Sequence, residues 1–194
     1  MIKIENIETW GFEHAIRGMR NPLNSWGKSD SYTMHIENPQ TLNTADFQFV
    51  LGENDLALMR KLYRAGPEHR KYLRQIFVSI DIIAPLYWWK EFDTYKVGTV
   101  ANSCSTMHTI AKKEFTIDDF SHEHLDWCKN LDGDHVNENP YDVLDYYVIG
   151  CLNRAREAYL ETKDKKFWWF MIQLLPSSFN QRRTVTMNYE ARKK

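Results

Sequence analysis

The sequence predicts an α+β fold with a small, mostly antiparallel sheet and packed helices. Apolar residues recur at helical spacing in residues 53–65 and 141–162, which is typical of helices with one buried face. Residues 76–85 read "IFVSIDIIAP", with β-branched residues at every second position, as in a strand. Helices and strands do not follow the regular alternation of a parallel sheet, so the α+β class is favoured.

Proline and glycine mark the element boundaries, because proline lacks an N–H and disfavours a helical conformation in the residue before it. Asn21-Pro22 should end a first short helix, Gly66-Pro67 a second, and Pro85 the strand. In the first half of the chain the pattern predicts a helix within 10–26, strands or loops at 31–38 and 46–52, helices at 53–65 and 68–75, and the strand at 76–85. In the second half it predicts a helix at 86–96, a polar turn region at 97–107, a helix at 116–130, a loop at 132–140 and helices at 141–162 and 165–175. Residues 182–190 are predicted to form a strand or the entry to a further helix.

Length and composition predict a single domain over residues 1–194. Apolar residues make up 43% of the chain, which is too many for a disordered protein. The net charge of -1 predicts no strong attraction to long nucleic acid or to an anionic membrane. The apolar runs are short, so no membrane span is expected.

The cysteines and the first residues favour a cytoplasmic protein. Cys104, Cys128 and Cys151 show no CxxC spacing and are odd in number, which is typical of reduced thiols. The chain also starts without the basic residues and apolar run of a secretory signal.

Metal and nucleophile motifs are weak. His122 and His124 lie two residues apart, which on a helix points them to different faces, and a calcium loop with its terminal Glu is absent. We therefore expect no metal site. Cys104 and His108 lie four residues apart and would meet on a helix, but nucleophilic catalysis needs further groups that spacing does not identify. No catalytic residue is predicted.

Two tryptophan pairs, Trp88-Trp89 and Trp168-Trp169, have two interpretations. Their rings could stack on a base or on a flavin. Adjacent residues of a helix point about 100° apart, so one ring of each pair should pack inward while the other lies at an interface. Packing is the favoured interpretation.

Three patches resemble one known family. They read "GFEHAIRGMRNPLNSW" (11–26), "IFVSIDIIAPLYWWKEFDTYKVGTVANSCSTM" (76–107) and "LLPSSFNQRRTVTMNYE" (174–190). Their order and motifs resemble the flavin-dependent thymidylate synthases, in a divergent branch associated with phages and their bacterial hosts. The resemblance implies that family's fold, a nucleotide ligand, FAD as a cofactor, and a homotetramer whose sites lie between subunits.

The resemblance also implies nucleotide contacts in the last patch. In the family an Arg six residues after the Leu-Pro proline contacts the nucleotide, and an Asn follows six residues later, which places Arg182 and Asn188 here. Arg17 and Arg20 lie in the patch that resembles the family's early helix. Neighbouring residues of a strand point to opposite faces, so Arg182 should point into the pocket and Arg183 away from it.

The family signature RHRxxSxNExSxR is degenerate in this chain. Its Arg-His-Arg places fall on Thr94, Tyr95 and Lys96, and Met107 stands at the final Arg. A flavin pyrophosphate needs several aligned donors to offset the desolvation of its charges, so we do not expect tight FAD binding. Polar residues at the serine and asparagine places are Thr99, Asn102 and Ser105, the last two with one residue inserted.

These observations predict a nucleotide-binding protein in preference to a working synthase. In a phage it could be a sponge for a nucleotide immune signal or a regulator of pyrimidine metabolism. Two alternatives are flavin-dependent methyl or hydroxymethyl transfer to a pyrimidine nucleotide, and a protein-binding module with tryptophan anchors. The predicted nucleotide-binding residues are Arg17, Arg20, Lys96, Thr99, Asn102, Ser105, Arg182, Arg183 and Asn188.

Overall fold

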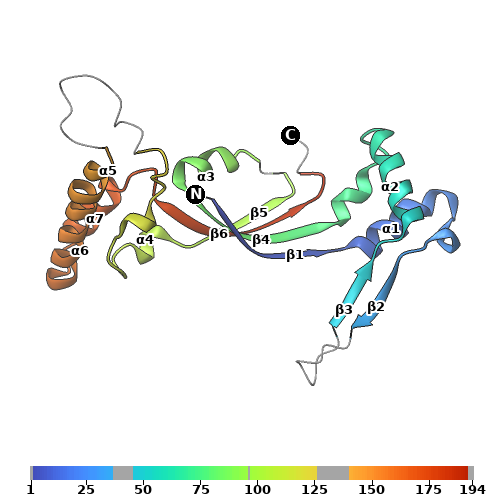
Figure 1. Ribbon diagram of the computed structural model, residues 1–194, viewed down its shortest axis with the longest axis horizontal. Helices are drawn as coiled ribbons and strands as arrows, with labels where there is room; N and C mark the ends of the chain where they lie inside the picture. Colours follow the sequence, from blue (N-terminus) through green and yellow to red (C-terminus); the bar gives the residue numbers. More distant parts are fainter. Residues whose placement is uncertain (1, 37–45, 96, 126–139, 192–194) are drawn as a thin grey trace. The chain divides into compact units, whose positions relative to one another are not determined.

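The protein combines helices with β-sheet, as the sequence predicts (Figure 1). The computed structural model describes residues 2–36, 46–95, 97–125 and 140–191. The strands are β1 (Lys3–Trp10), β2 (Tyr32–Ile36), β3 (Asp46–Val50), β4 (Phe77–Pro85), β5 (Thr99–Ser103) and β6 (Asn180–Asn188). The α-helices are α1 (Phe12–Arg20), α2 (Glu53–Arg64), α3 (Leu86–Phe92), α4 (Thr106–Thr109), α5 (Pro140–Asp142), α6 (Gly150–Thr162) and α7 (Lys165–Leu174). The 3-10 helices are η1 (Asn21–Leu23), η2 (Trp26–Lys28), η3 (Lys71–Gln75) and η4 (Ile117–Asp119), and η6 (Val143–Ile149) is a π-helix.

The strands form two sheets in the described part of the chain. The larger sheet has the order β1-β4-β6-β5, so β4, the clearest strand of the sequence analysis, lies inside it beside β6. Of the two interpretations of residues 182–190, the strand is confirmed as part of β6. The second sheet is the antiparallel hairpin of β2 and β3, in which Tyr32 pairs with Val50 and His35 with Phe47. The predicted α+β class with a small antiparallel sheet is confirmed.

The chain divides into two compact units. Unit 1 comprises Met1–Asn6, Ile80–Lys96 and Ala101–Val185, and unit 2 comprises Ile7–Ser79, Val97–Val100 and Thr186–Lys194. The expectation of a single domain over residues 1–194 stays a prediction.

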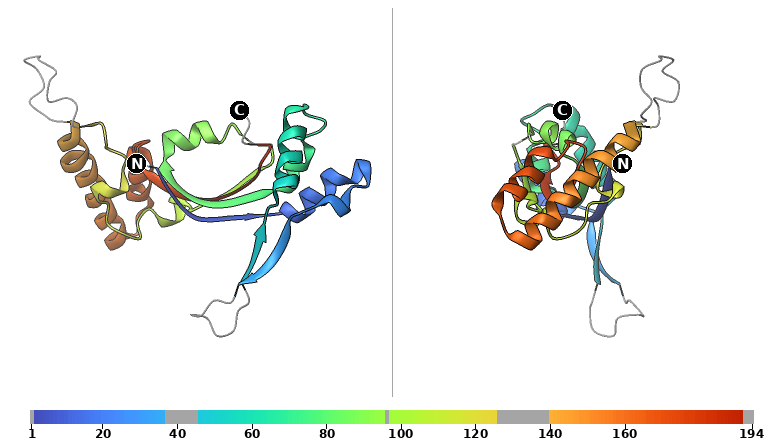
Figure 2. Two further views of the ribbon diagram at one scale, coloured as in Figure 1. Left: turned by 45° about the vertical axis from the view of Figure 1, so that its right-hand side comes forward. Right: turned by 90° about the vertical axis from the view of Figure 1, so that its left-hand side faces the viewer.

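Unit 1 is built around the helix pair α6 and α7, which lie side by side in both views of Figure 2. The apolar face predicted for residues 141–162 is buried in part, because Leu144, Leu152 and Ala155 are buried whereas Val143 and Tyr147 are exposed. Lys163 turns the chain in the left-handed conformation, and Asp164 caps α7 by accepting a hydrogen bond from the Lys166 N–H at 2.9 Å. The buried core of unit 1 comprises Ile110, Phe115, Phe120, Leu144, Ile149, Leu152, Ala155 and Met171.

Unit 2 packs α1 and α2 around a second core. α1 starts after Gly11, which has a φ of 90°, and ends at Arg20, directly before the Asn21-Pro22 step that was expected to stop it. Tyr72 is buried and donates its hydroxyl proton to the Met59 carbonyl at 2.7 Å, which ties η3 to α2. The core comprises Ala15, Ile16, Met19, Met59, Tyr72, Leu73 and Ile76.

Some predicted elements differ from the structure in ways that tertiary contacts explain. The polar region 97–107 contains β5 and the start of α4, because the chain pairs with β6, where Cys104 donates its N–H to the Arg182 carbonyl. The helix expected at 116–130 is only η4 in its described part. There Phe120 forms a bridge with Phe179 and the Ser121 N–H binds the Ser178 carbonyl, so the chain is held extended. Residues 126–130 of that helix and residues 132–139 of the expected loop lie outside the described residues.

The helices at 68–75 and 86–96 are shorter than expected, as η3 and α3. Among the described residues, no helix has both the length and the apolar character needed to cross a membrane.

Candidate functional site

The arginine pair of β6 presents its side chains to two different environments, as strand geometry requires. Arg182 contacts carboxylates of β1 and β4, whereas Arg183 contacts α3. Arg182 also lines a pocket of unit 1, and Arg183 does not. Arg182 and Arg183 therefore point to different faces of β6, as expected, and their role in nucleotide binding stays a prediction.

Arg182 is held by two acidic side chains. Its Nη2 donates to Glu5 Oε2 and to Asp81 Oδ2, both at 2.9 Å. Asp81 also accepts hydrogen bonds from Thr184 Oγ1 at 2.6 Å and from Asn6 Nδ2 at 2.9 Å. The hydrogen bond from Thr184, with those from Asn6 and Arg182, lowers the pKa of Asp81 to about 2. The hydrogen bond to Asp81 in turn raises the pKa of Arg182, so Asp81 and Arg182 are both charged at neutral pH.

Arg183 fastens α3 to β6. Its guanidinium carbon lies 4.3 Å from the centre of the Trp89 ring, and its Nη1 is 2.7 Å from Asp93 Oδ1. Trp89 is buried and donates its indole N–H to the Gln181 carbonyl at 2.9 Å. Arg183 thus has a structural partner on each side, which is a sufficient physical reason for its presence.

The tryptophan pairs pack as adjacent helical residues should. Trp89 is buried while Trp88 is half-buried and stacks on Phe92. In the second pair, Trp168 donates to the Met107 carbonyl at 3.2 Å and Trp169 is exposed. Neither pair forms an open parallel platform, because the two rings of each pair meet edge to face.

The pocket beside Arg182 lies wholly within unit 1. It is formed by Ile83 of β4, by Cys104 directly after β5, by α4 and the segment after it, and by Phe179 with the first residues of β6. Its cavity volume is ≈ 380 Å³, which is at the lower end of the size range of small-molecule sites. The apolar lining is Ile83, Ile110, Phe115 and Phe179, and the polar lining is Cys104, Thr106, Thr109, Lys112, Lys113, Asp119, Asn180, Gln181 and Arg182.

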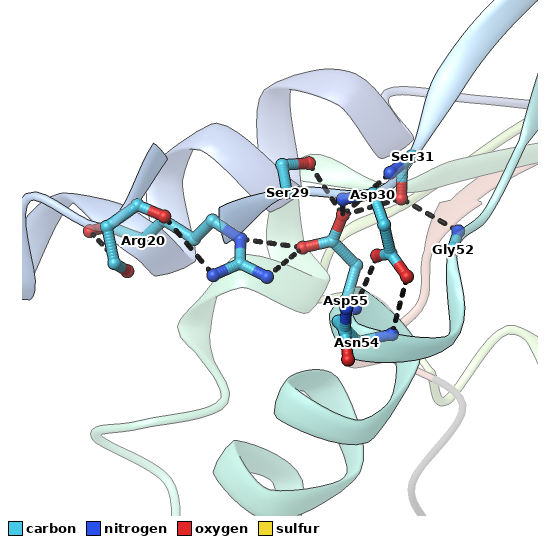
Figure 3. A network of polar contacts seen from close by, with 8 residues as sticks. Arg20, Ser29, Asp30, Ser31, Gly52, Asn54 and Asp55 are labelled. Carbon is cyan, nitrogen blue, oxygen red and sulfur yellow. Dashed lines mark hydrogen bonds and ion pairs between the residues drawn. The ribbon is translucent and has the colours of Figure 1, made fainter. Parts of the chain in front are cut away.

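The two arginines of α1 belong to unit 2. Arg17 is exposed and lines a second pocket, next to Tyr32 and Phe49. Arg20 is 4% exposed and forms a salt bridge at 2.6 Å with Asp55 of α2, which is fully buried (Figure 3).

Both carboxylate oxygens of Asp55 accept hydrogen bonds. Its Oδ1 accepts from Arg20, and its Oδ2 accepts from the hydroxyls of Ser29 and Ser31 at 2.6 and 2.7 Å and from the N–H groups of Asp30 and Ser31 (Figure 3). Burial raises the pKa of Asp55, but the hydrogen bonds from Ser29, Ser31 and Arg20 and the Arg20 charge outweigh it, and the pKa lies at about 2. These contacts give Arg20 a structural role in unit 2, and because it also lines the pocket beside Arg17 its role in nucleotide binding stays a prediction.

The remaining predicted residues are divided between the units. In unit 2, Thr99 lies on β5 and Asn188 accepts hydrogen bonds from the N–H groups of Glu190 and Ala191. In unit 1, Asn102 is exposed on β5. Ser105 caps α4 and its hydroxyl lies 2.6 Å from His108 Nδ1. Lys96 lies outside the described residues.

The pairing considered between Cys104 and His108 is replaced by this contact between Ser105 and His108. The Cys104 sulfur instead lies 3.9 Å from Thr109 Oγ1. No group of three or more potential metal ligands occurs in the described part of the chain.

Four charged residues of unit 1 escaped the sequence analysis: Glu5, Asp81, Lys112 and Lys113. Asp81 carried a visible signal, because it is a carboxylate inside an otherwise apolar strand. Lys112 and Lys113 follow α4 as an ordinary basic pair, and only the folded chain shows that both line a pocket.

Comparison with known proteins identifies the fold. No protein-family model and no curated protein sequence matches the chain. Among solved structures, thymidylate synthase ThyX from Helicobacter pylori, with FAD and dUMP, matches with a TM-score of 0.60 at 13% identity, over 98% of this chain and 80% of that chain. The UMP/dUMP methylase PolB from Streptomyces cacaoi, bound with 5-Br dUMP, matches with a TM-score of 0.53 at 15% identity, over 98% of this chain and 75% of that chain. The resemblance expected from the three sequence patches is confirmed at the level of architecture: this chain has the fold of the flavin-dependent thymidylate synthases.

Proposed function

We propose that the chain is a nucleotide-binding protein that uses this fold with a degraded flavin signature. The observation that carries the proposal is the pocket of unit 1, which joins an apolar lining to three basic side chains, Lys112, Lys113 and Arg182. A nucleotide presents the matching combination of a flat base and a charged phosphate. Two proteins of the same fold were solved with dUMP or a brominated dUMP, which supports a pyrimidine nucleotide as the first ligand to test.

The biological role we propose is sequestration or sensing of a nucleotide, as a phage-type sponge or as a regulator of pyrimidine metabolism, in the cytoplasm and in a homo-oligomer. Family resemblance suggests a tetramer. In such an assembly Arg17, Thr99, Asn102 and Ser105 could join a site completed by a neighbouring subunit. Size-exclusion chromatography with light scattering measures the oligomeric state directly.

Our first prediction contrasts the two arginines of β6. Arg182→Ala should weaken dUMP binding at least about tenfold. The change removes a hydrogen-bond donor from the pocket, and it leaves the carboxylates of Glu5 and Asp81 near the ligand without the cation that now pairs with them. Arg183→Ala should leave dUMP binding within about threefold. It should lower the free energy of unfolding by about 1 kcal/mol, because its contacts with Trp89 and Asp93 are lost. Isothermal titration calorimetry with dUMP and thermal melts of the same samples measure both effects.

Equal, small effects of the two changes on binding would return the pair to a purely structural role. Loss of binding in Arg183→Ala alone, with an intact melt, would show that the other face of β6 carries the ligand. Absence of any dUMP, UMP or cyclic nucleotide binding at millimolar concentration would reject the proposed function.

Flavin-dependent methyl or hydroxymethyl transfer is the second candidate, because ThyX of the same fold was solved with FAD and dUMP. This chain lacks the family's signature arginines at Thr94 and Met107, and lysine at the remaining place does not replace a bidentate fork. We therefore expect the purified protein to be colourless and to leave the fluorescence of added FAD unchanged. A yellow protein, or one that quenches FAD fluorescence stoichiometrically, would favour the enzyme.

A further inference from the structure

We propose that Lys112 binds the phosphate of the ligand, and that Arg182 contributes hydrogen bonds to an uncharged part of the same ligand. The inference rests on the proposed function and assigns the two basic positions of the pocket different tasks. The sequence resemblance pointed to Arg182 as a residue that contacts the nucleotide, whereas the charges around the pocket point to Lys112 as the contact for its phosphate.

Charge compensation at Arg182 is the first step of the argument. One nitrogen, Nη2, lies 2.9 Å from a carboxylate oxygen of Glu5 and 2.9 Å from one of Asp81. One positive and two negative charges leave a local net charge of -1. A phosphate placed on this guanidinium would approach two fixed carboxylates, which repel it.

Arg182 keeps donors that suit a neutral acceptor. Both of its contacts use Nη2, and within the described ranges Nε and Nη1 have no hydrogen-bond partner. A guanidinium offers five N–H donors in a planar fork, so an edge of the fork stays open to a carbonyl or hydroxyl oxygen. The carbonyl oxygens of a pyrimidine base are acceptors of this kind.

The second step concerns the two lysines. Lys113 forms an ion pair with Asp119, whose side chain is 12% exposed and also lines the pocket. Lys112 has no ion pair within the part of the chain that the structure describes, and its side chain is exposed. Lys112 is thus the lining cation whose charge is not offset by a described carboxylate, and a phosphate is attracted there most strongly.

Neighbouring groups fit this placement. The Thr106 hydroxyl lines the pocket and accepts a hydrogen bond from Gln181 Nε2 at 3.1 Å, which leaves its own proton free to donate to a phosphate oxygen. Phe115 and Phe179 line the same pocket, with ring centroids 6.4 Å apart. An apolar lining of this kind suits the base and leaves the charged end to the polar residues.

The test separates the contribution of the phosphate from that of the nucleoside. Calorimetry on the full chain compares deoxyuridine with dUMP, and the ratio of their dissociation constants defines the phosphate increment. Lys112→Gln should reduce this increment about tenfold, the factor expected for one charge-assisted hydrogen bond. The change should leave the dissociation constant of deoxyuridine unaltered. The salt dependence of dUMP binding should fall in the same variant.

Three comparison variants make the result specific. Arg182→Gln should weaken deoxyuridine and dUMP together and keep the phosphate increment. Lys113→Gln removes a lysine already offset by Asp119 and should change the increment less than about threefold. Lys90→Gln removes an exposed lysine of α3 that does not line the pocket and should change nothing.

A phosphate increment that survives Lys112→Gln and disappears in Arg182→Gln would overturn the inference while leaving the proposed function intact. Absence of binding of both deoxyuridine and dUMP by the unmodified protein would overturn both. All of these substitutions except Arg182→Gln affect exposed lysines, so thermal melts should confirm that each lysine variant stays folded.

Discussion

Asp55→Asn should lower the free energy of unfolding by about 3–5 kcal/mol, the largest loss we expect from a single polar substitution in this chain. The change removes the negative charge opposite Arg20, which is 4% exposed and then lies buried without a counter-ion. The new amide group would also turn N–H donors towards the hydroxyls and N–H groups that Oδ1 and Oδ2 now accept from. The melting temperature should fall by roughly 10 °C.

The same substitution has a pH signature. The folded-state pKa of Asp55, about 2, lies below its ordinary value of 3.8. A lowered pKa contributes stability that is fully present above about pH 4 and is lost as the pH falls towards 2. The Asn variant should therefore lose less stability than the unmodified protein between pH 4 and pH 2. Urea titrations across this range measure both slopes.

The control is Asp118→Asn, which removes an exposed carboxylate of η4 and should change the stability by less than about 0.5 kcal/mol. A loss below about 1 kcal/mol for Asp55→Asn would contradict the burial of the Arg20–Asp55 pair. Equal acid sensitivity of both proteins would contradict the lowered pKa.

Gly11→Ala should be the most damaging small substitution. Gly11 has a φ of 90°, and a Cβ at this position would lie 2.0 Å from the backbone oxygen of Gln75. Alanine adds the strain of the left-handed region to an overlap with backbone atoms that cannot rotate away. Together we expect a loss of about 3 kcal/mol or more, measured by urea unfolding.

Two other glycines separate the causes of that loss. Gly66 has a φ of 117° but open space around its Cβ position, so Gly66→Ala should show the conformational strain alone, about 1 kcal/mol. Gly27 has neither a positive φ nor a neighbour within 4 Å, so Gly27→Ala should be close to neutral. A loss in Gly11→Ala no larger than in Gly66→Ala would show that Gln75 does not press against Gly11.

The sequence by itself determined the elements whose signals are local. The periodicity of residues 141–162 and 53–65 located the long helices, and Asn21-Pro22 ended α1 as expected. The alternating run that became β4 was equally clear, because a strand with one or both faces buried repeats its apolar residues every second position. These signals depend only on residues that are close together in the sequence, so they can be recognised without the tertiary structure.

β5 shows why other elements were missed. Its residues, Thr99–Ser103, are mostly exposed and polar at the edge of the larger sheet, so they carry no apolar alternation. Cys104 is the residue directly after β5, and the hydrogen bond from its N–H to the Arg182 carbonyl joins residues that are far apart in the chain. Hydrogen bonds between distant backbone segments leave no local trace in composition.

Only the tertiary structure decided what the charged residues of the candidate site do. The Leu-Pro segment located Arg182, but its partners Glu5 and Asp81 lie 177 and 101 residues away in the sequence. Asp55, the buried partner of Arg20, likewise lies 35 residues away in the sequence. The effect of a charge depends on which opposite charges fold beside it and how far water is excluded. Those distances are set by the packing of the whole chain, so the sequence identified the arginines and only the fold showed which side chains lie beside them.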